Sequence, residues 1–234
     1  LITVDGINSS QQIVIPNLGY ADAAIDSYGV FQKLRNKGAI PPNIRFQIGL
    51  PTPYSVATFY GHKSIQGLLE EAYQNALMTE ITRILDAIPH DNLAIQWEVV
   101  SEFAVLEGLV ASHIEKNIID QLTNRVGNLV DLVPSKAEVG IHLCYGDSGH
   151  KHFCEPEDTT YLSEFSNGIA ASSKRRIDWL HLPVPRDRDD KEYFGPLANL
   201  NLDKETELYL GLVHSTGGIE GTRRRIRTAK NFVT

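Results

Sequence analysis

Apolar positions along this chain follow two regular patterns that take turns. Five short runs are almost continuously apolar, and each precedes a longer stretch in which apolar residues recur every three or four positions. The first pattern is typical of parallel strands buried on both faces, and the second of amphipathic helices. We therefore predict five strand–helix units, with strands at 45–50, 93–100, 139–145, 177–184 and 207–214 and helices at 64–87, 115–132, 157–172, 189–200 and 218–232.

The segment before the first unit has a different character. Residues 1–16 hold two short β-rich pieces around a cluster of Gly, Asn and Ser, whereas apolar residues at 19–37 have helical spacing. Gly38 then provides a helix stop, and Pro41-Pro42 prevents the helix from continuing. We predict one additional helix ahead of the first strand.

Repeated strand–helix units fit either an open doubly wound sheet or a closed (β/α)8 barrel. No glycine-rich nucleotide-binding motif follows any of the strands, and polar residues end several of them, as expected around the mouth of a barrel. We predict a single α/β domain over residues 1–234 with a TIM-barrel fold. Five units and a possible strand at 1–6 are too few for eight strands, so we expect further strands before residue 1 or after residue 234.

Composition narrows the classes of partner. The net charge of −7 argues against general nucleic-acid binding, and the one basic cluster, Arg223–Arg225, is more typical of a solvated helix face. No apolar run is long enough to span a membrane, and two cysteines give no disulfide framework. We expect a cytoplasmic protein that acts on a small molecule, with its oligomeric state left open.

The stretch from Glu138 to Asp147, E-V-G-I-H-L-C-Y-G-D, carries the densest candidate chemistry. Alternate side chains of a strand share a face, so His142 and Cys144 point the same way and suit two corners of a zinc site. Simpler explanations are a hydrogen-bonded histidine and a buried cysteine that acts as a small apolar residue. Asp147 either orients His142 or caps a turn. Cys154 is an alternative redox partner for Cys144, and the loop adds further candidate ligands at His150, His152 and Glu155.

Other predicted strand ends carry polar residues of their own. Glu98 shares a face with Gln96, and a carboxylate there needs a cation, a hydrogen-bond donor or a metal. His181 lies inside the fourth strand, and Arg186 follows it, where it could bind a carboxylate or phosphate. His214 ends the fifth strand next to a helix start and is a candidate acid or base, or simply a residue bonded to its own loop.

These strand ends resemble, in order, the C-terminal catalytic barrel of cobalamin-independent methionine synthase, a family in the superfamily of uroporphyrinogen decarboxylase. The resemblance covers residues 46–234. Family strands read H-x-C-Y at two zinc ligands, I-Q-I-D-E-P at an acid that binds the homocysteine amine, and I-H-S at a catalytic histidine. The present chain reads I-H-L-C-Y, I-Q-W-E-V and V-H-S at these places. The resemblance thus aligns His142 and Cys144 with the zinc ligands, Glu98 with the acid and His214 with the catalytic histidine.

The chain also departs from that family. Alignment through Arg186 places Pro183 where the family has its third zinc ligand, a glutamate, and the fourth ligand, a cysteine, would follow residue 234. His181 could take the place of the third ligand. R-F-Q-x-x-L-P-T-P, H-L-C-Y-G-D, P-V-P-R-D-R-D-D and E-G-T-R-R-R-I are more similar to an uncharacterised, methionine synthase-like branch.

The resemblance implies zinc-dependent methyl transfer to the thiol of a homocysteine-like substrate, with methyl-folate as a possible donor. The implied zinc ligands are His142, Cys144 and His181; Glu98, Gln96, Asp147 and Arg186 would contact the substrate, and Glu98 and His214 would be catalytic. Two alternatives remain open. One is a metal-free decarboxylase or lyase that uses Arg186, His181 and His214; the other, favoured by Pro183, is a small-molecule-binding barrel with a degenerate site.

Overall fold

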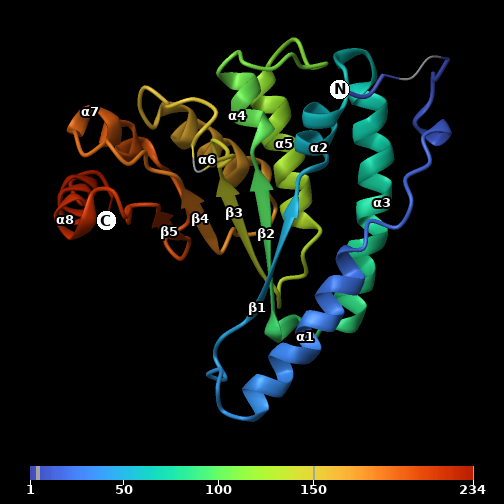
Figure 1. Ribbon diagram of the computed structural model, residues 1–234, viewed down its shortest axis with the longest axis horizontal. Coiled ribbons are helices and arrows are strands. Elements are labelled where there is room, and N and C mark those ends of the chain that lie inside the picture. Colours follow the sequence, from blue (N-terminus) through green and yellow to red (C-terminus); the bar gives the residue numbers. More distant parts are fainter. Residues whose placement is uncertain (4–5, 150, 234) are drawn as a thin grey trace.

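The computed structural model describes residues 1–3, 6–149 and 151–233, and its centre is a parallel sheet (Figure 1). The strands pair in chain order and are β1 (Phe46–Pro51), β2 (Leu93–Val99), β3 (Glu138–Leu143), β4 (Trp179–Leu182) and β5 (Glu207–Leu210). A doubly wound sheet reverses its strand order at a switch point, whereas a TIM barrel keeps chain order. The predicted α/β fold with a parallel sheet is confirmed, and its order is compatible with part of a barrel. Closure of the barrel stays a prediction.

Helices connect the strands (Figure 1). They are α1 (Tyr20–Asn36), α2 (Pro53–Tyr60), α3 (Gln66–Ala87), α4 (Ser101–Leu106), α5 (Ile118–Asp131), α6 (Thr160–Ser172), α7 (Lys191–Phe194) and α8 (Gly218–Ala229). The short helices α2 and α4 were not predicted. Thr52 caps α2 through its side chain and Pro53 occupies the first turn, so the motif that reads as a strand end also starts a helix.

The two faces of the sheet differ. One face packs its apolar side chains, such as Trp97, Ile141 and Leu180, into the core that the helices share. The opposite face, called the open face below, carries mostly polar and partly exposed residues: Gln47, Gly49, Ala94, Gln96, Glu98, Glu138, Gly140, His142, Trp179, His181, Glu207 and Tyr209. The prediction of burial on both faces is wrong for the described residues, because the helices cover only one of them.

The last two strands are shorter than predicted. Proline has no backbone N–H for the ladder, and β4 ends just before Pro183. Beyond β5, Gly211 still donates its N–H to the Leu182 carbonyl, but the Leu212 N–H bonds to the carbonyl of Leu210, two residues back, and turns the chain. His214 therefore lies in the loop after β5 rather than in the strand. The predicted helix at 189–200 is α7 followed by a 3-10 turn over Gly195–Asn199.

Glu102 ties the C-terminal ends of β1 and β2 together. Its side chain is 1% exposed and accepts hydrogen bonds from the hydroxyls of Thr52 and Ser55, each at 2.5 Å, and from the Val100 N–H at 3.0 Å. Burial raises the pKa of this carboxyl above its usual range. The Glu102 carboxyl thus links the two strand ends, and its charged form is unfavourable in this buried place.

No helix among the described residues combines the length and the apolar content that crossing a bilayer requires. The possible strand at 1–6 includes residues 4 and 5, which lie outside the described residues. Ile2 makes one isolated parallel bridge to Gly61.

Candidate functional site

Strand register brings three of the predicted residues together on the open face. Glu98 is the register partner of His142, and His142 is the partner of His181. The Nδ1 of His142 lies 2.6 Å from Oε2 of Glu98, and the two imidazole rings stack with centroids 4.5 Å apart and planes 18° from parallel. One face of β2, β3 and β4 therefore presents a carboxylate and two imidazoles as a single cluster.

A second row of side chains holds the carboxylate in place. Gln96 donates to Oε1 of Glu98 at 2.7 Å, and the indole N–H of Trp179 donates to Oε1 of Gln96 at 3.0 Å. The indole lies flat over Gly140, where a Cβ atom would come within 1.8 Å of the ring. Trp179 and Gly140 escaped the sequence analysis. An aromatic residue and a glycine at facing positions of two strands could have indicated this contact, but only once the strand register is known.

The charges of the cluster follow from its contacts. Burial alone would raise the pKa of Glu98, but the hydrogen bonds from His142 and Gln96 outweigh it and hold the pKa below its usual value. Burial, reinforced by the neighbouring His142, lowers the pKa of His181. At neutral pH the cluster thus contains an ionised Glu98 and a neutral His181. With Nδ1 of His142 directed at the carboxylate, Nε2 is the nitrogen left to face a ligand.

Cys144 follows β3 at the same end of the sheet. Its Sγ accepts a hydrogen bond from the Gly146 N–H at 3.2 Å, and burial raises the pKa of the thiol. Cys154 also has a raised pKa, to about 11, through burial and the nearby Glu107. Both cysteines are free. The charged groups near Cys144 are Glu98 and Asp147, whereas those near Cys154 are Glu107 and Glu155. Nothing in this arrangement favours the redox pair over separate thiols.

The remaining predicted residues lie in loops. His214 donates from Nε2 to the Val184 carbonyl at 2.8 Å, so within the described residues its hydrogen bond ties the loop after β5 to the loop after β4. Arg186 and Asp147 are exposed residues of the loops after β4 and β3. His152 pairs with Glu155 at 3.1 Å, and His150 lies outside the described residues.

The donor set fits zinc in part. His142 has the arrangement common among metal-bound histidines, with one ring nitrogen on a carboxylate and the other available, and Cys144 supplies a sulfur from the same strand end. His181 stacks almost parallel to His142, so the nitrogen lone pairs of the two rings do not converge on one point. Pro183 offers only a carbonyl, which accepts from the Tyr193 hydroxyl at 3.2 Å. No group of three potential ligands converges among the described residues, whereas catalytic zinc usually has three.

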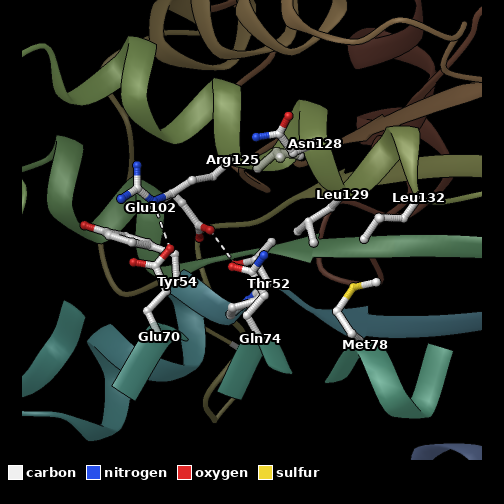
Figure 2. Close-up of a pocket in the computed structure, with 12 residues that line it drawn as sticks. Thr52, Tyr54, Glu70, Gln74, Met78, Glu102, Arg125, Asn128, Leu129 and Leu132 are labelled. Atoms are coloured by element: carbon white, nitrogen blue, oxygen red, sulfur yellow. Dashed lines mark hydrogen bonds and ion pairs between the residues drawn. The ribbon is translucent and has the colours of Figure 1, made fainter. Parts of the chain in front are cut away.

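Two hollows lie on opposite sides of the sheet. One, of about 690 Å³, lies on the open face and includes His181 of the cluster. Its other lining residues include Gln47, Gln96, Trp179 and Tyr209. A smaller one, of about 240 Å³, lies on the helix side of the sheet between α3 and α5 (Figure 2). Figure 2 shows Arg125 bonded to Glu70, and Glu102 to Thr52, across that smaller hollow. None of the predicted site residues lines the smaller hollow, so we place the candidate site on the open face.

No protein-family model matches the chain, and no curated protein sequence matches it significantly. A similar solved structure is described as "the Putative Vitamin-B12 Independent Methionine Synthase from Listeria monocytogenes", with a TM-score of 0.50 and 14% sequence identity. The similarity covers 92% of this chain and 58% of that one, so the chain spans little more than half of its neighbour's length. At this identity the likeness concerns the fold alone.

Proposed function

We propose that this chain is a methionine synthase-like barrel enzyme that transfers a methyl group to the thiol of a homocysteine-like substrate. The observation that carries the proposal is the hydrogen bond between Glu98 and His142 beside Cys144, at the C-terminal ends of neighbouring parallel strands. Active sites of TIM barrels lie at this end of the strands. The similar solved structure, named as a methionine synthase, supports the same class of reaction.

Each residue of the cluster has a role in this proposal. His142 through Nε2 and Cys144 through Sγ would hold zinc, and His181 is the nearest further imidazole. Bound zinc would keep the substrate sulfur as a thiolate near neutral pH. The ionised carboxylate of Glu98, fixed by Gln96, suits the substrate amine, and Asp147 and Arg186 would contact the substrate from the loops. His214 would act as a general acid or base, and methyl-folate is the proposed methyl donor.

Zinc content tests this proposal directly. Purified protein loaded with zinc and then dialysed is expected to retain about one equivalent, because a histidine and a thiolate are strong zinc ligands. His142→Ala and Cys144→Ser are each expected to retain less than about a tenth of an equivalent. His152→Ala, which removes a loop histidine paired with Glu155, is the matched control and should keep the full amount. Zinc below about a tenth of an equivalent in the unaltered protein would refute the zinc site.

A second candidate function is decarboxylation or lyase chemistry on a carboxylated substrate without metal, with the cluster moving a proton. Glu98, His142 and His181 already form a hydrogen-bonded and stacked set, and the neutral His181 could accept a proton. In this alternative, Arg186 would bind the substrate carboxylate.

Cys144→Ser separates the two candidates. The metal-free candidate predicts that Cys144→Ser keeps its decarboxylase or lyase activity within about twofold and that His181→Ala loses this activity. The zinc proposal predicts that Cys144→Ser loses methyl transfer. Release of CO₂ from a panel of small carboxylic acids is the measurement. Thermal shifts with thiols, amino acids and folates complete the comparison, because a ligand that binds the folded state raises the melting temperature. Binding without turnover would favour a barrel with a degenerate site.

A further inference from the structure

Arg225 is a buried cation in the second turn of α8. Its side chain is 1% exposed and extends back toward the start of the helix. Nε donates to the Leu212 carbonyl at 2.7 Å and Nη1 to the Arg186 carbonyl at 2.6 Å. Nη2 is buried and has no hydrogen-bond partner among the described residues. The guanidinium thus connects the loops after β4 and β5 and still has donor capacity left.

No carboxylate neutralises this guanidinium within the part of the chain that the structure describes. The acids on or beside α8 are paired with other arginines: Asp189 with Arg224 at 2.7 Å and Glu220 with Arg223 at 2.7 Å. A buried charge without a counterion, and a buried N–H without an acceptor, are both unfavourable. The site is therefore short of one negative, hydrogen-bond-accepting group.

The backbone next to Nη2 has the shape of an anion cradle. Gly217 has φ −89° and Gly218 has φ +54°, the right-handed then left-handed sequence that turns successive N–H groups toward one point. These residues begin α8, a helix of 12 residues whose N-terminus carries partial positive charge. A Cβ atom on Gly217 would lie 3.1 Å from Nη2 and 3.2 Å from Nη1 of Arg225. Because Gly217 has no side chain, the guanidinium packs directly against the backbone at the start of the helix.

We propose that the start of α8 and Arg225 form a binding site for a small oxyanion, the phosphate or carboxylate of a ligand. The Gly218 N–H already donates to the Ser215 carbonyl at 3.2 Å. Nη2 of Arg225 and the next backbone N–H groups, those of Ile219 and Glu220, would therefore share the oxygen atoms, the arrangement that helix N-termini and arginine both favour. The site lies at the same end of the sheet as His214, three residues before Gly217. It stands independently of the zinc proposal, because none of its groups is a proposed metal ligand.

Calorimetric titration with inorganic phosphate and, separately, with acetate tests the site at constant ionic strength. The unaltered protein is expected to bind one of the two anions at one site, and the stronger one identifies the source of the oxyanion. Gly217→Ala, whose φ suits alanine, is expected to weaken binding about tenfold because the added Cβ pushes the guanidinium away from the helix start. Arg225→Lys is expected to weaken binding by about the same factor through loss of the Nη2 donor. Gly29→Ala, with nothing within 4 Å of the added atom, and Arg223→Ala, an exposed arginine of the same helix, are the controls and should bind within about twofold of the unaltered protein.

The proposal fails if neither anion binds at concentrations up to about 50 mM, well above the range expected for a specific millimolar site. It also fails if Gly217→Ala binds as tightly as the unaltered protein, or if Arg223→Ala weakens binding as much as Gly217→Ala does, since that would indicate general attraction to basic residues. Gly217→Ala keeps the test decisive where Arg225→Lys does not fold. Zinc content, measured on the same samples, reports on the proposed function separately.

Discussion

Glu102→Ala is expected to lower the free energy of unfolding by about 3–5 kcal/mol. The substitution removes the acceptor of three hydrogen bonds in a fully buried place, and leaves the hydroxyls of Thr52 and Ser55 and the N–H of Val100 to find other partners. It also leaves a cavity between the ends of β1 and β2. Urea denaturation followed by circular dichroism is the measurement, and Glu71→Ala, an exposed glutamate on α3, is the matched control, expected within about 0.5 kcal/mol.

Glu102→Gln separates the hydrogen bonds from the charge. Because burial raises the pKa of Glu102 in the folded protein, its neutral form is favoured there, so the related stability is fully present below the unfolded pKa of about 4.3 and is lost as pH rises through the folded pKa. Gln mimics the neutral form and has no such dependence. We expect the stability of Glu102→Gln relative to the unaltered protein to increase with pH. A difference that stays constant from about pH 5 to 9 would show that the carboxyl does not titrate with a raised pKa.

Gly140→Ala is expected to destabilise the protein by about 1–3 kcal/mol, because the added Cβ overlaps the Trp179 ring, 1.8 Å away, and the indole must leave its place. The displaced indole can no longer donate to Gln96, which itself holds Glu98. We therefore expect a lower urea midpoint, which reports the weakened fold. We also expect reduced zinc retention, which reports the weakened candidate site.

A double-mutant cycle identifies the indole as the cause. In a Trp179→Ala background the overlap disappears, and alanine should become better than glycine at position 140 by about 0.5–1 kcal/mol, since glycine inside a strand is entropically unfavourable. The sign of the effect is thus expected to reverse. An equal loss of stability in both backgrounds would assign the strain to the backbone instead.

Much of the fold could be predicted because its signals are local. The apolar runs that become β1, β2 and β3 and the helical spacing of α3 lie within single stretches of sequence. The chain order of the strands follows from the repetition of one unit. The short helix α2 could not be predicted because Thr52 and Pro53 serve two purposes, ending a strand and capping a helix.

The candidate site was partly predictable for the same reason. His142 and Glu98 occupy the right parity at the ends of their strands, so a common face was expected, but the hydrogen bond between them depends on a register that only pairing fixes. The position of His214 depends on the turn made by Leu212 and Leu210, and the buried Arg225 sits within a basic run typical of a solvated face. These features arise from contacts between distant segments.

The two-faced sheet has a consequence for how such a protein diverges in evolution. Its stability rests on the face that packs against the helices, whereas the candidate chemistry lies on partly exposed residues whose replacement costs the fold little. Substitutions can therefore accumulate among the groups that meet a ligand without unfolding their carrier. A lineage can therefore exchange one side chain of the open face for another and pass through folded intermediates at every step.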